Sequence, residues 1–149
     1  FWHILPEAAK ASTISLYAFA ALGGFFAMVP DFDLMLGQAF HRKWFSHSLF
    51  AGAVFAVFVY SLKAWLPKYL PQATRLTASP TFPYAAVLAF LAHTSHILTD
   101  ALTDAGAPVF WPLSRKHYSA TPVNSGNPFL NGAVIVLCLF ATYHLAKAV

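Results

Sequence analysis

Long apolar runs alternate with short polar stretches along the 149-residue chain. The runs cover about residues 12–30, 47–66, 82–100 and 129–146, and each approaches the roughly 20 residues that a helix needs to cross a hydrocarbon core. The first run lacks the basic n-region and the cleavage site of a signal peptide, so we interpret it as a helix as well. The pattern predicts an all-α fold, a polytopic membrane bundle of about four transmembrane helices.

Prolines and glycines mark the connections between these runs. Pro30 should end the first helix, and a polar linker with four prolines, residues 66–83, separates the second helix from the third. Residues 101–128 combine several prolines with glycines, which predicts an irregular loop after the third helix. We expect residues 1–149 to form a single membrane-embedded domain.

The composition agrees with a membrane protein. Hydrophobic residues make up 58% of the chain and charged residues 9%, against about 45–50% and about 25% in soluble domains. We therefore predict a multi-pass protein of the inner cell membrane. The basic residues are scattered, which excludes a nucleic-acid footprint and favours membrane lipids or an anionic substrate as partners. They divide almost evenly between the two predicted faces, so the orientation stays open.

The few acidic residues are concentrated in two short stretches. Asp31 and Asp33 stand in PDFD, and Asp100 and Asp104 in HTSHILTDALTD, which together hold four of the five acidic residues. Ionisable groups at the edge of a membrane helix are costly and by default mark a functional site. The acidic distribution therefore predicts a site at these two stretches.

Helix direction brings the two stretches to one membrane face, because successive spanning helices alternate in direction. This face should carry the ends of the first and third helices and the start of the second, and therefore the side chains of Asp31, Asp33, His41, His47, His93, His96 and Asp100. His96 and Asp100 are four residues apart, so they lie on one helix stripe and can share an ion. Imidazole nitrogens with carboxylate oxygens suit zinc or a similar divalent ion.

Each of these residues also has a structural explanation. Asp31 fits a turn, and His47 can simply be the first residue of a helix. His96 and Asp100 can form a hydrogen bond with each other without any metal. His93 lies one turn deeper along the helix. We expect it either to contact a metal ligand or to be a buried core histidine.

The blocks VPDFD, HRKWFSHS, HILTDALTDAG and WPLS occur in this order between about residues 23 and 119. In this respect the chain resembles the YdjM-type, LexA-regulated family of membrane-bound metal-dependent hydrolases. The resemblance implies a polytopic membrane fold, a metal-dependent hydrolase activity and metal ligands at Asp31, Asp33, His41, His47, His96 and Asp100. The family is distantly similar to zinc-dependent phospholipases C and P1-type nucleases.

Family members often begin with a further apolar helix that carries a histidine, whereas this chain opens at Phe1. We expect that an N-terminal helix is missing, with His3 as the alternative source of the ligand.

These features together predict a hydrolase that uses zinc, or alternatively manganese, to cleave a phosphoester at the membrane surface. Asp33 is the expected general base, with Asp104 as the alternative, and Asp100 supports the ion that activates water. Arg42 is expected to neutralise charge on an anionic lipid substrate, with Arg115 as the alternative. The competing interpretation is a non-enzymatic membrane metal-binding protein, which would be a transporter, a sensor or a zinc-stabilised scaffold.

Overall fold

The computed structural model describes residues 13–37, 41–42, 45–80, 82–125, 127 and 129, with side chains from residue 21 onward. Within these residues the regular structure is helical, and no strand occurs beyond one isolated bridge between Ala107 and Tyr118. The prediction of an all-α fold is confirmed. The elements are α2 (Thr13–Met28), the 3-10 helix η2 (Val29–Leu36), α3 (Leu49–Tyr69), the 3-10 helix η3 (Pro71–Ala73), α4 (Thr74–Ala78) and α5 (Phe82–Ala101).

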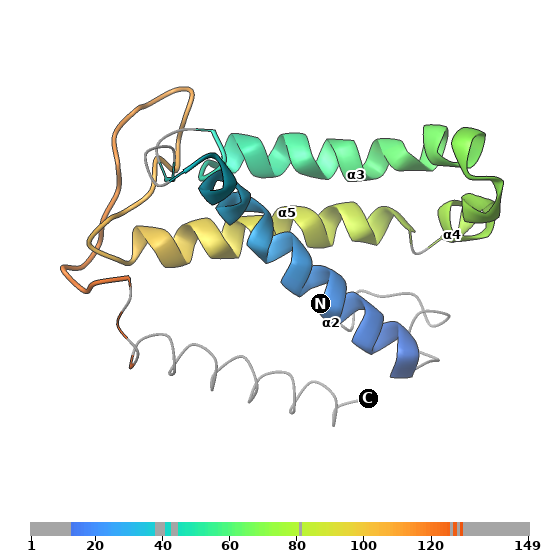
Figure 1. Ribbon diagram of the computed structural model, residues 1–149, viewed down its shortest axis with the longest axis horizontal. Coiled ribbons are helices and arrows are strands. Elements are labelled where there is room, and N and C mark those ends of the chain that lie inside the picture. The colour runs from blue at the N-terminus through green and yellow to red at the C-terminus, as the bar shows by residue number, and fades with distance from the viewer. Residues whose placement is uncertain are drawn as a thin grey trace.

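The long helices α3 and α5 lie side by side and run in opposite directions (Figure 1). The short elements η3 and α4 reverse the chain between them at one end. At the other end, α3 begins and α5 ends, and α2 crosses obliquely so that η2 reaches the same place. Three separate segments of the chain therefore meet at this end of the helices.

The first turn of α3 explains why His47 stands outside the helix. Ser48 has an extended backbone and its hydroxyl accepts a hydrogen bond from the Ala51 amide at 3.1 Å, which is the geometry of a helix N-cap. The helix therefore begins at Leu49 rather than at residue 47. The expected end at residue 66 is also wrong, because the last turn runs through Pro67 to Tyr69.

Small residues allow the helices to approach closely. Ala86 and Ala89 of α5 pack with Phe26 and Val59 in the main apolar core. A Cβ atom at Gly52 of α3 would lie 3.0 Å from Cδ2 of His93. Glycine at this position lets the two backbones come together, as in many membrane helix pairs.

Within the described residues, α3 is the one helix that is long and apolar enough to cross a membrane, judged by length and composition. Helix α2 has 16 residues, fewer than the roughly 20 required. Helix α5 has 20 residues, but its C-terminal half is polar. The predicted span at 129–146 lies outside the described residues apart from Phe129. The described part thus contains one candidate span, and the four-helix bundle stays a prediction.

The loop that follows α5 is irregular, as predicted, but it is firmly attached. Val109 packs with Ile97 in a second apolar cluster, and its carbonyl accepts a hydrogen bond from the Leu49 amide at 3.0 Å. Gly106 has φ +64, and a Cβ there would lie 2.6 Å from the Tyr118 carbonyl oxygen, so only glycine fits this turn. The loop closes over the end where α3 begins.

Candidate metal centre

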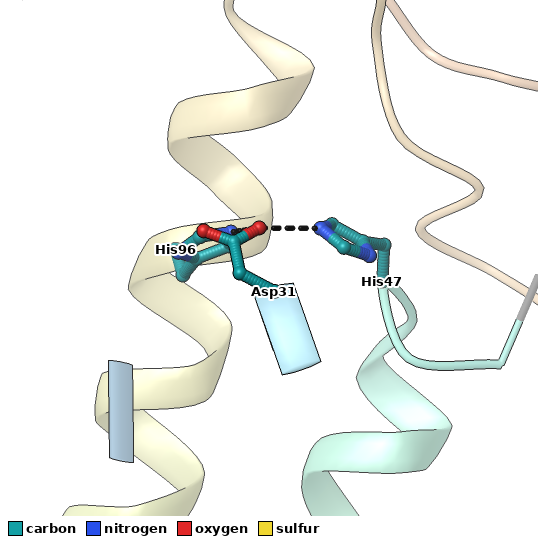
Figure 2. Close-up of side chains that lie close together, drawn as sticks. All are labelled: Asp31, His47 and His96. Atoms are coloured by element: carbon teal, nitrogen blue, oxygen red, sulfur yellow. Dashed lines mark ion pairs between the residues drawn. The ribbon is translucent and has the colours of Figure 1, made fainter. Parts of the chain in front are cut away.

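Asp31, His47 and His96 come together from η2, the segment before α3, and α5 (Figure 2). The Asp31 Oδ1 atom lies 3.4 Å from His47 Nε2 and 3.3 Å from His96 Nε2. Asp100 completes the group, because its Oδ2 atom lies 3.2 Å from His47 Nε2 and 3.5 Å from His96 Nε2. We call Asp31, His47, His96 and Asp100 the metal cluster.

Three atoms of the metal cluster are buried without any hydrogen-bond partner. They are Nε2 of His47, Nε2 of His96 and Oδ2 of Asp100. Buried polar atoms normally have a partner, so an orphaned group of this kind points to an ion or water. Ligand atoms bound to one zinc ion at about 2.1 Å lie about 3.4 Å apart in a tetrahedron, close to the 3.2 to 3.5 Å that separate the two carboxylate oxygens from the two imidazole nitrogens here. The donors fit a zinc-type ion.

Asp31 is the most exposed member of the metal cluster. Its side chain is 41% exposed, whereas the side chains of His96, Asp100 and His47 are 19%, 8% and 0% exposed. Among the four donors, solvent therefore reaches Asp31 on η2 most readily.

Asp33 lies behind the metal cluster and organises its surroundings. Its carboxylate contacts His41 Nδ1 at 2.9 Å and His47 Nδ1 at 3.2 Å, and it accepts hydrogen bonds from the Ser46 hydroxyl at 2.6 Å and the Arg42 amide at 3.3 Å. A carboxylate that holds Nδ1–H of a histidine directs the lone pair of Nε2 towards a metal. Nδ1 of His47 also forms a hydrogen bond with the Ser46 hydroxyl at 3.1 Å, so Ser46 and Asp33 together orient His47 towards the metal cluster.

Asp33, His41 and His47 form a second group whose geometry can hold an ion. It uses Nδ1 of His47, whereas the metal cluster uses Nε2. A neutral imidazole offers a lone pair on one nitrogen only, so the two groups compete for the same ring. The orphaned atoms favour the metal cluster. The ligand roles predicted for Asp33 and His41 stay predictions that depend on the second arrangement.

Arg42 brings a positive charge to the edge of the site. Its Nη2 atom lies 2.7 Å from Asp100 Oδ1, and its Nε is buried without a hydrogen-bond partner. The residue has φ +58, a left-handed backbone that costs a non-glycine residue about 1 kcal/mol. The hydrogen bond from its amide to Asp33 helps to hold this conformation.

Electrostatics keep the acidic groups ionised. The nearby imidazoles of His47 and His96, at 3.4 and 3.3 Å from Asp31 Oδ1, hold the pKa of Asp31 well below its usual value. Burial lowers the pKa of His47, but contacts with Asp100 and Asp31 outweigh it, so that this pKa lies above its usual value. Burial favours protonation of Asp33, but hydrogen bonds from Ser46 and His41 outweigh it and lower its pKa. The carboxylates therefore stay negatively charged and can attract a metal ion.

Other residues named from the sequence lie elsewhere. His93 is 2% exposed beneath the cluster, with its ring centroid 6.4 Å from that of Phe55. Asp104 accepts a hydrogen bond from the Ala105 amide, and Arg115 is exposed in the loop after α5. Sequence reasoning missed Ser46, although a hydroxyl next to a candidate ligand histidine is a recognisable signal.

The family to which the chain belongs follows from comparison with known proteins. The family described as YdjM inner membrane protein matches residues 3–149, almost the entire chain. Neither a search of curated proteins nor a search of solved structures returned a match. The extent of the family match supports a membrane location and leads to one conclusion: the chain belongs to the YdjM inner membrane protein family.

Proposed function

We propose that this protein is a membrane-bound, metal-dependent hydrolase that cleaves a lipid-like phosphoester at the membrane surface. The observation that carries the proposal is the set of buried ligand atoms without hydrogen-bond partners on His47, His96 and Asp100, next to the partly exposed Asp31. A site with buried ligand atoms and one partly exposed donor suits catalysis.

The metal cluster would hold zinc, with manganese as the alternative. A bound divalent ion supplies Lewis acidity and lowers the pKa of water at the site. Asp33 keeps His47 in the orientation that binds, through its contact at 3.2 Å. Arg42, which contacts Asp100, is placed to attract the negative charge of a phosphoryl group.

The reaction consumes one water molecule for each ester bond. The water oxygen forms a bond to phosphorus, and the bond between phosphorus and the alcohol oxygen breaks. One proton of the water passes to the leaving alcohol, and the other stays with the phosphate product. We assign the transfer of the water proton to a carboxylate outside the four donors. Asp33 is the candidate, because its lowered pKa keeps it ionised and its carboxylate lies next to the cluster, 3.2 Å from His47 Nδ1.

A purely structural metal site is the second candidate, because the four side chains of the cluster are enough to close a tetrahedral site. X-ray absorption of the zinc-loaded protein separates the two. A fifth, exchangeable oxygen donor supports the hydrolase, and four protein donors alone support a scaffold.

The hydrolase is tested with full-length protein in detergent, loaded with zinc or manganese. The substrates are a panel of lipid phosphomonoesters and phosphodiesters. We expect turnover of at least one of them, its loss on chelation and its recovery when metal is added back. If no lipid phosphoester is hydrolysed, or if hydrolysis survives chelation, the proposal fails.

We further propose that the chain is multi-pass, with about four spanning helices and the metal cluster at one membrane face. Single cysteines at Leu36 and Leu113, in a background without Cys138, should react with an impermeant reagent from one side of the membrane, and a cysteine at Gln72 from the other side. These positions are exposed, whereas a side chain at Gly106 would collide with Tyr118. Labelling of Leu36→Cys and Leu113→Cys from opposite sides would contradict this topology.

A further inference from the structure

A deep apolar groove lies between α2, α3, α4 and α5, away from the metal cluster. Its volume is about 410 Å³, within the range of about 300 to 1,000 Å³ that is usual for small-molecule sites. Every residue that lines it is apolar, including Leu22, Phe26, Phe58, Leu62, Leu66 and Phe82. The groove offers no hydrogen-bond partner, so the part of a ligand that lies in it should be apolar over its whole length.

The groove runs along the helix that is suited to crossing the membrane. Its lining on α3 extends from Phe55 to Leu66, which corresponds to about 17 Å at the helical rise per residue. Since α3 is the candidate span, the groove lies at the depth of lipid tails. An alkyl chain is the occupant that this shape and this depth favour.

Two aromatic rings lead from the groove towards the metal cluster. Phe32 follows Asp31 in η2, and its ring lies edge-on to that of Phe25 with centroids 6.0 Å apart. Phe25 in turn lines the groove, and both residues are about half exposed. These two rings form an exposed apolar contact between the neighbour of Asp31 and the groove.

The direct route through the protein interior is closed. Phe26 and Phe55 lie edge to face with centroids 5.4 Å apart, and Phe55 also packs near His93, beneath the cluster. A ligand that occupies both places must therefore pass outside, over Phe25 and Phe32. Such a ligand has a polar head at the cluster and an apolar tail in the groove.

We propose that this groove holds one acyl chain of the lipid whose phosphoester headgroup reaches the metal cluster. The proposal rests on the proposed hydrolase for the headgroup, whereas the acyl chain can be tested without turnover. Lipid tails are as apolar as the groove itself, so packing and length, rather than the hydrophobic effect, should decide which chains bind. The groove is expected to select substrates by chain length.

The binding test uses wild-type protein in dioleoyl phosphatidylcholine vesicles and, as probe, a phosphatidic acid with one chain that ends in a diazirine. We expect labelling of Leu62, Leu66 or Phe82 to be several-fold stronger than labelling of Val57, which is exposed on α3 outside the groove. Excess dimyristoyl phosphatidic acid should suppress the groove label, and the dihexanoyl form should not. Equal labelling of both faces of α3 would overturn the proposal. Absence of label from the groove, because a segment of the protein itself occupies it, would also overturn the proposal.

The turnover test compares long-chain and short-chain phosphatidic acids in the variant Leu62→Trp, which places a large ring in the groove. We expect kcat/KM for the dimyristoyl substrate to fall about tenfold, with the dihexanoyl substrate within about twofold of wild type. Val57→Trp is the matched control on the same helix and should change neither value. Hydrolysis that is indifferent to chain length in Leu62→Trp refutes the groove alone, whereas groove labelling without any hydrolysis refutes the hydrolase alone.

Discussion

Replacing His96 by alanine is expected to leave the purified protein with less than about a tenth of its divalent metal. The Nε2 atom of His96 contacts Asp31 at 3.3 Å and Asp100 at 3.5 Å, so the variant loses a ligand and weakens the binding of both carboxylates. Elemental analysis of protein purified without chelator measures the change.

Two further variants show whether this loss is specific. His117→Ala removes an exposed histidine from the loop and should keep the wild-type metal content. Asp33→Asn keeps all four donors of the cluster but weakens the orientation of His47, so we expect metal affinity to fall about ten- to a hundredfold. Wild-type protein without metal, or His96→Ala with full metal content, would contradict the proposed centre. Complete metal loss in Asp33→Asn would instead make Asp33 a direct ligand.

Asp100→Asn is expected to lower kcat by at least about a hundredfold on any phosphoester that the wild-type protein cleaves. Mutating a residue that hydrogen-bonds a metal ligand usually lowers activity by up to about a hundredfold. Mutating the ligand itself should lower activity by at least as much. The Oδ2 atom of Asp100 lies 3.2 Å from His47 Nε2, and its Oδ1 atom pairs with Arg42. An amide keeps the shape but lacks the charge for both contacts. Initial rates at saturating metal measure the effect.

Arg42→Gln provides the contrast, because it removes positive charge but no ligand atom. We expect it mainly to raise KM, by about tenfold, while kcat changes less. Arg115→Gln changes an exposed loop residue and is the matched control. An Asp100→Asn variant with wild-type kcat would refute the role of Asp100, and an unchanged KM in Arg42→Gln would refute substrate capture by Arg42.

The convergence of the site could be predicted from the sequence because it depends on two simple regularities. His96 and Asp100 share a stripe because a helix repeats every 3.6 residues. Asp31 and His47 reach that stripe because the neighbouring helices run in alternating directions, so that their ends meet. The structure brings these four side chains together as expected.

The distinction between Asp31 and Asp33 could not be predicted in the same way. Both stand in PDFD, and which carboxylate faces the cluster depends on the 3-10 geometry of η2 and on the left-handed backbone of Arg42. These features arise from tertiary contacts such as the hydrogen bond from the Arg42 amide to Asp33. Residue spacing alone carries no information about them.

The number of spanning helices is harder to predict for a related reason. Hydropathy is averaged over a window of residues. The polar residues in the last turns of α5 lower the mean hydropathy of this helix, so hydropathy alone does not decide whether α5 spans the membrane. The start of α3 shows the same limit, because its boundary is set by the hydroxyl of Ser48 rather than by the apolar run.

The origin of the ligands in three separate segments has a consequence for the lifetime of the protein in the cell. Asp31, His47 and His96 are far apart along the chain, and Asp31 stands on η2, most of whose apolar side chains are exposed. An ion bound at the proposed centre would act as a cross-link between η2, the start of α3 and α5, and its binding free energy would add to the stability of the folded state. Without the ion, we expect η2 to detach first and to offer proteases an exposed segment. The abundance of the protein should in that case follow the supply of the metal in the cell, without any change in its synthesis.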